Sequence, residues 1–177
     1  MTRALLLLLS VAVSMACAAK ADLATAVEVE RLTTGWIDTG MMDGKHKIVP
    51  GAVFVLTNVS DQTLGPVQVN AIFRQVDDPR EWSSAYVPEA VGELAPGATT
   101  GPITVKGEKG YTSDARADTM LSNANFVDAR LELFVRSGSS AWTKLGEYPI
   151  DRRLMMPSTA AAADSGSERL RSQAERR

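Results

Sequence analysis

Residues 126–136 alternate with a period of two, and this pattern constrains the fold more than any other feature of the sequence. Apolar side chains take every second position, and the positions between them are mostly charged. The first set is Val127, Ala129, Leu131, Leu133 and Val135, and the second is Asp128, Arg130, Glu132, Phe134 and Arg136. Because side chains alternate between faces along an extended chain, the pattern predicts a half-buried β-strand.

Other segments predict further strands. Residues 67–73 show the same alternation, and residues 52–56 are apolar on both faces, as is typical of a central strand. Residues 27–30 alternate Val with Glu and predict an edge strand whose glutamates discourage edge-to-edge pairing. The remaining expected strands are residues 82–87, 103–105 and 141–150.

The connections between these segments carry turn residues. They are Asn58–Asp61, Pro96-Gly97 and Ser137–Ser140. One short helix is expected over residues 114–123, capped by Ser113, with Met120 and Leu121 facing inward. Short strands joined by turns, without alternating long helices, predict an all-β antiparallel sandwich of about seven strands.

Residues 50–106 resemble the bacterial immunoglobulin-like domains of the FxLYD type. The resemblance lies in the run VLTNVSD at residues 55–61, the alternating segment VQVNAIF at residues 67–73 and the turn LAPGA at residues 94–98. The aromatic–acid signature of that family is replaced here by Ala71-Ile72-Phe73-Arg74. The resemblance implies an exported or cell-surface immunoglobulin-like β-sandwich that is usually non-catalytic, and it names no ligand.

Residues 1–21 have the features of a signal peptide. Arg3 supplies the positive charge, and an uncharged, Leu-rich stretch spans residues 4–16. As a helix this stretch is about 20 Å long, which is short of the roughly 30 Å hydrocarbon core of a bilayer. Ala19-Lys20-Ala21 then gives the small-x-small pattern of a cleavage site, so cleavage is expected after Ala21, before Asp22.

An alternative processing route uses Cys17, the only cysteine. The segment Ser14-Met15-Ala16-Cys17 is similar to a bacterial lipoprotein signal, although Ser14 stands where Leu is usual. Lipidation would tether the protein through a diacyl anchor, and this is the only membrane attachment that we expect. Either route predicts a periplasmic or outer-membrane location. The expected domain is residues 22–156, followed by a disordered tail at residues 157–177 with one sizeable apolar residue, Leu170.

Most catalytic chemistries lack their residues in this chain. One Cys and one His exclude Cys-cluster and multi-His metal sites. A formal net charge of −2 gives no footprint of nucleic-acid binding. His46 has no Ser or Cys near it in the sequence, and no phosphate-binding glycine loop is present. We therefore expect a non-enzymatic protein without a cofactor.

Two alternatives stay open at this stage. Met41, Met42 and His46 lie within six residues, and thioether and imidazole ligands suit copper, so a periplasmic copper-binding module is one alternative. A hydrolase is the other, and it would need two carboxylates brought together from different strands.

Trp36 is the candidate binding residue. It lies in residues 33–47, the longest segment without a clear strand pattern, and long loops of a sandwich often carry binding residues. The sequence thus predicts an exported binding or assembly module of the bacterial cell envelope, with an envelope protein or a glycan as its partner.

Overall fold

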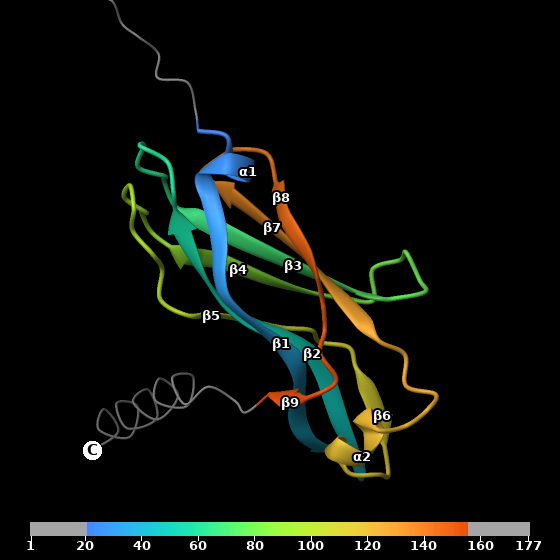
Figure 1. The fold of residues 1–177 in the computed structure, drawn as a ribbon. Helices are drawn as coiled ribbons and strands as arrows, with labels where there is room; N and C mark the ends of the chain where they lie inside the picture. Colours follow the sequence, from blue (N-terminus) through green and yellow to red (C-terminus); the bar gives the residue numbers. More distant parts are fainter. Residues whose placement is uncertain (1–20, 156–177) are drawn as a thin grey trace, which may run out of the picture.

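The computed structural model describes residues 21–155, which fold into two β-sheets packed face to face (Figure 1). The signal peptide, Cys17 and the tail from residue 157 lie outside the described residues. The elements in chain order are α1 (Leu23–Ala26), β1 (Val27–Met42), β2 (Lys45–Asn58), β3 (Val67–Gln75), β4 (Ser83–Val91), β5 (Ile103–Lys106), β6 (Tyr111–Ser113), α2 (Ala117–Leu121), β7 (Ala129–Ser137), β8 (Thr143–Pro149) and β9 (Leu154–Met155).

The strand order is that of an immunoglobulin-like sandwich. One sheet has the order β5-β2-β1-β9, with β6 also paired to β2, and the other has the order β4-β3-β7-β8. Immunoglobulin domains likewise place strands A, B and E in one sheet and C, F and G in the other. The predicted fold class is therefore confirmed. The described chain has nine strands and two short helices, because β6, β9 and α1 are added to the expected elements.

The alternating segments bury the faces that the sequence predicts. Every second residue of β7 from Ala129 to Ser137 is buried, and Leu131, Leu133 and Val135 are fully enclosed. Strand β3 does the same from Val67 to Phe73. These faces meet Phe54, Leu56 and Val105 of the opposite sheet in one core. Val127 departs from the pattern, because it precedes β7 and is 36% exposed.

Residues 33–47 are not a loop, which corrects the sequence-based expectation. They form the distal part of β1, a turn and the start of β2, with Met42 paired to Lys45. Asp43 and Gly44 both have positive φ angles, 52° and 77°. A two-residue connection of this kind is a type I′ turn, whose twist matches that of the strands. The two strands thus make one long hairpin.

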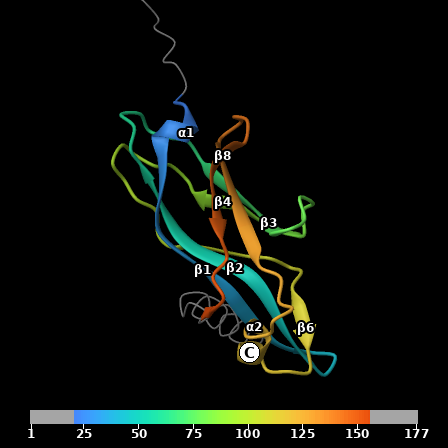
Figure 2. The ribbon, with the colours of Figure 1, turned by 45° about the vertical axis from the view of Figure 1, so that its right-hand side comes forward.

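Trp36 is a core residue and not part of a binding surface, a second correction. It lies on the inner face of β1 opposite Pro50 and has no exposed area. Its ring contacts those of Phe126, Tyr111 and Trp82, with centroid distances of 4.8, 5.6 and 6.1 Å. Both views show the hairpin extending past the four-stranded sheet toward β6, α2 and β9 (Figure 1; Figure 2). These four rings cover that extension.

The expected helix is present but shorter, and Ser113 does not cap it. Helix α2 begins after Arg116, and no side chain caps it. The Ser113 hydroxyl instead accepts a hydrogen bond from the backbone N–H of Ala115, two residues later. Met120 and Leu121 are buried as expected.

Asn58 ties together the two turns at one end of the sandwich. Its side-chain amide donates to the carbonyls of Gln62 and Leu94, both at 2.8 Å. Its carbonyl oxygen accepts from the backbone and hydroxyl of Ser60. Its backbone groups bond to Ala98 and Gly97. The residue is fully buried, so this set of hydrogen bonds satisfies a polar side chain that would otherwise be costly to enclose.

Asn58→Ala should therefore destabilise the fold by about 2 to 4 kcal/mol, because it leaves several buried polar groups without partners. Asp61→Ala, at an exposed position of the same turn, is the matched control and should change stability by less than about 0.5 kcal/mol. Urea denaturation of both variants measures the difference. Equal effects would show that the Asn58 bonds do not hold the two turns together.

Leu131→Ala tests the core directly. Leu131 is fully buried in β7, so its truncation should lower the free energy of unfolding by about 2 to 5 kcal/mol. Thr104→Ala, on an exposed position of β5, should cost within about 0.5 kcal/mol. Thermal or urea unfolding decides, and similar losses at both positions would contradict the assigned faces.

Candidate binding face

The outward face of the four-stranded sheet carries exposed aromatic side chains and a group of paired charged side chains. Residues paired across an antiparallel sheet project to the same side. The registers Gln68↔Arg136, Asn70↔Phe134, Ile72↔Glu132 and Arg74↔Arg130 place β3 and β7 residues there. Tyr86 and Ser84 of β4 and Lys144 and Glu147 of β8 join the same rows. We call this surface the outer face.

Two aromatic side chains are exposed at one end of the outer face. Tyr86 of β4 and Trp142, just before β8, are 53% and 37% exposed. Their ring centroids lie 6.1 Å apart, and the rings are nearly perpendicular at 78°. The two residues come from the two edges of the sheet, so the pair reaches across strands β3 and β7.

Arg136 and Gln68 lie beside this aromatic pair and contact it. The Arg136 guanidinium carbon lies 4.7 Å from the centre of the Trp142 ring. Its Nε donates to the Gln68 side-chain oxygen at 2.7 Å, and the Tyr86 hydroxyl donates to the same oxygen at 2.6 Å. We call Gln68, Tyr86, Arg136 and Trp142 the Arg136 cluster. One amide oxygen therefore fixes both a cation and an aromatic hydroxyl.

Next to the cluster, the outer face carries a network of ion pairs. Glu132 accepts from Lys144 and Arg74, both at 2.9 Å, and Glu147 lies 3.1 Å from both Lys144 and Arg130. The hydrogen bond from Lys144, together with Arg74, lowers the pKa of Glu132. The two carboxylates raise the pKa of Lys144 in turn. The charges in this network are thus satisfied within the protein.

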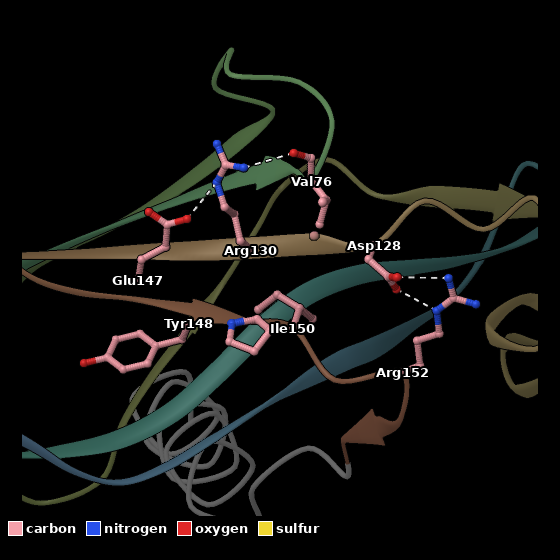
Figure 3. A pocket seen from close by; sticks show the side chains of 9 residues that line it. Val76, Asp128, Arg130, Glu147, Tyr148, Ile150 and Arg152 are labelled. Atoms are coloured by element: carbon pink, nitrogen blue, oxygen red, sulfur yellow. Dashed lines mark hydrogen bonds and ion pairs between the residues drawn. The ribbon is translucent and has the colours of Figure 1, made fainter.

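A groove of about 680 Å³ lies where β8 ends, beside the network (Figure 3). Val76, Tyr148 and Ile150 give it apolar walls. Its charged side chains are paired with one another: Arg152 donates to Asp128 at 2.6 and 3.0 Å, and Arg130 lies 3.1 Å from Glu147.

The groove does not provide the acid pair that the hydrolase alternative needs. Figure 3 shows Asp128 and Glu147 each directed at its own arginine. The hydrogen bond from Arg152 lowers the pKa of Asp128. A general acid needs the opposite shift.

The three candidate copper ligands do not converge. Met41 is paired with His46 across the hairpin, whereas Met42 is paired with Lys45. Neighbouring residues of a strand project to opposite faces, so Met42 points away from the other two. His46 instead lines a small cavity with Asp38 and the cationic Arg116. Within residues 21–155, no group of three or more His, Cys, Asp or Glu side chains could hold a metal.

Two solved structures are remotely similar to this chain. No family model and no curated protein matches this chain. The chain is similar to the X-ray structure of Northeast Structural Genomics Consortium target SoR45, with 16% identity and a TM-score of 0.40, over 77% of this chain and 92% of that one. It is also similar to the ligand binding region of Serine-glutamate repeat protein A of Enterococcus faecium, with 12% identity and a TM-score of 0.31, over 72% of this chain and all of that one. Likenesses this distant assign no function.

Residues 21–155 contain no helix that is both long and apolar enough to span a bilayer.

Sequence reasoning missed the Arg136 cluster, although a pattern for it exists. Arg136 closes the polar set of the alternating strand, and Trp142 follows the short Ser137–Ser140 connection. A hairpin at Ser137–Ser140 would bring the residues before and after this turn close together. The structure forms this hairpin, because Val135 of β7 pairs with Thr143 of β8. The sequence analysis selected Trp36, which is buried, as the candidate binding residue and did not select Trp142, which is 37% exposed.

Glu132→Gln should make the free energy of unfolding less dependent on pH in the acidic range. Because the folded pKa of Glu132 is lowered, its contribution is complete above its ordinary value of 4.5 and is lost as the pH falls through the folded value. The stability difference between wild type and variant should therefore shrink between pH 7 and pH 3 in urea denaturation. For Glu89→Gln, at an exposed position, the difference should stay small at both pH values. A pH-independent difference for Glu132→Gln would contradict the ion network.

Proposed function

We propose that this protein is an exported, non-enzymatic binding module that holds a protein partner against the outer face of its four-stranded sheet. The observation that carries the proposal is the Arg136 cluster, in which the exposed rings of Trp142 and Tyr86 pair with each other and a fixed guanidinium lies over Trp142. Trp, Tyr and Arg are the residue types that most often dominate the energy of protein interfaces. Their presence together on one face of a sheet supports a binding role for this surface.

The form of this surface favours a protein over a small molecule. Small ligands are usually enclosed in concave pockets that bury most of their area. The Arg136 cluster lies instead on the pleated outer side of a sheet, where Gln68 and Arg136 form one row and Tyr86 stands in the next. A flat partner surface can cover several rows at once, with the aromatic pair as its anchor.

Export to the periplasm or outer membrane is part of the proposal. It rests on the signal-peptide features of residues 1–21 and on the resemblance to the exported FxLYD-type domains. Asp22 is the N-cap of α1, and the first element begins at Leu23. Cleavage after Ala21 would leave every described strand and helix intact, and so would cleavage with lipidation at Cys17.

Site-specific photocrosslinking in the native host tests the proposal. A photoreactive residue at Ala141, which is exposed beside Trp142, should give a discrete protein adduct. The same residue at Thr104, on the outward side of the other sheet, is the control and should give none. Trp142→Ala or Tyr86→Ala should weaken the Ala141 adduct about 30-fold, the loss expected for an interface anchor of about 2 kcal/mol.

Two results would overturn this function. One is equal labelling at Ala141 and Thr104, and the other is no protein adduct at Ala141 in cells that export the folded domain. Circular dichroism of each purified variant confirms that the fold is retained.

A further inference from the structure

Arg136 differs from most other arginines of the described chain because it has no acidic partner. Within residues 21–155, six arginines form ion pairs with Asp or Glu: Arg74, Arg80, Arg116, Arg130, Arg152 and Arg153. Arg31 and Arg136 do not. Arg31 is exposed in β1, whereas Arg136 is partly buried and lies within the surface that we propose to bind a partner.

The guanidinium of Arg136 is held by two contacts that leave its terminal nitrogens unused. Nε donates to the Gln68 oxygen, and the guanidinium carbon lies over the Trp142 ring. Over the described residues, neither terminal nitrogen donates a hydrogen bond. An arginine fixed in this way has already lost much of the side-chain freedom that binding would otherwise remove.

The surrounding charge favours an anion. The outer face carries four cationic side chains, Arg74, Arg130, Arg136 and Lys144, against the two carboxylates of Glu132 and Glu147. The whole chain has the opposite sign, with a formal net charge of −2. The ion network engages Arg74, Arg130 and Lys144, so among these four cations Arg136 alone has no carboxylate beside it within the described residues.

We infer that Arg136 recognises an aspartate or glutamate side chain on the protein partner, next to an apolar side chain that packs on Trp142 and Tyr86. This inference rests on the proposed function and specifies its partner. The planar guanidinium fork matches a carboxylate through two parallel hydrogen bonds. The open sheet face admits a side chain that projects from a folded surface, and the aromatic pair accepts the apolar neighbour.

The first test titrates the full chain with blocked peptides and follows the Arg136 Nε–H and Trp142 indole N–H resonances by NMR. The probe is acetyl-Leu-Glu-Leu-amide, and its matched control is acetyl-Leu-Gln-Leu-amide. The Glu peptide should bind saturably and at least about 10-fold more tightly than the Gln peptide, since only it offers a charged acceptor. Arg136→Gln should abolish this preference, Arg136→Lys should restore it in part, and Arg116→Gln should leave it unchanged.

Other carboxylate sources serve as competing probes in the same titration. Acetyl-Leu-Gln-Leu with a free C-terminus presents a main-chain carboxylate, and glucuronic acid presents a sugar carboxylate. Tighter binding of either one than of the Glu peptide would overturn the assignment to a protein side chain. Equal binding of the Glu and Gln peptides, or an unchanged preference in Arg136→Gln, would overturn the role of Arg136.

The second test separates this inference from the proposed function. Arg136→Gln, combined with the photoreactive residue at Ala141, should reduce the protein adduct at least about 10-fold, and Arg116→Gln should not. An adduct that persists undiminished in Arg136→Gln would leave the binding face standing and overturn carboxylate recognition. Absence of any adduct at Ala141 in the wild-type sequence would instead overturn the proposed function itself.

Discussion

The unequal length of the two sheets is the constraint on which the rest of this structure depends. Strand β1 has 16 residues, whereas β3 and β7 have nine each. At about 3.3 Å per residue the hairpin is roughly 20 Å longer than the sheet that packs against it. The aromatic rings around Trp36 cover this extension. Among the described residues the Trp36 indole N–H has no hydrogen-bond partner, so packing alone must stabilise its burial.

One alternation produces both the core and the outer face. Leu131, Leu133 and Val135 must be buried for the sandwich to exist, and this fixes Phe134 and Arg136 on the opposite side. The pleat therefore leaves these outward positions open to selection for binding without disturbing the core. A one-residue slip of β7 would bury Arg136 and expose Leu133. The same packing that stabilises the fold thus holds the proposed site in register.

Sequence reasoning succeeded where a pattern repeats and failed where structure depends on distant pairing. The period of β3 and β7 predicted their buried residues correctly. Strands β6 and β9 have three and two residues, too few to show a period, and they exist because β2 and β1 offer them an edge. The burial of Trp36 needed knowledge of Tyr111 and Phe126, which lie far along the chain. Asp43-Gly44, by contrast, is a local sequence pattern that is typical of a two-residue hairpin turn. The interpretation of residues 33–47 as a loop did not take this pattern into account.

On the outer face, the ion pairs and the proposed contact residue Arg136 occupy different places. Glu132 and Glu147 pair with the cations nearest the groove, Arg74, Arg130 and Lys144. Arg136 lies in a different row, bonded to the neutral Gln68, with Phe134 between it and Glu132 along β7. Among residues 21–155, removing its charge therefore breaks no ion pair and leaves no carboxylate unpartnered. Arg136 is instead held by Gln68 and Trp142, and this geometry, which leaves its terminal nitrogens without a described partner, is the reason we propose that it contacts another molecule.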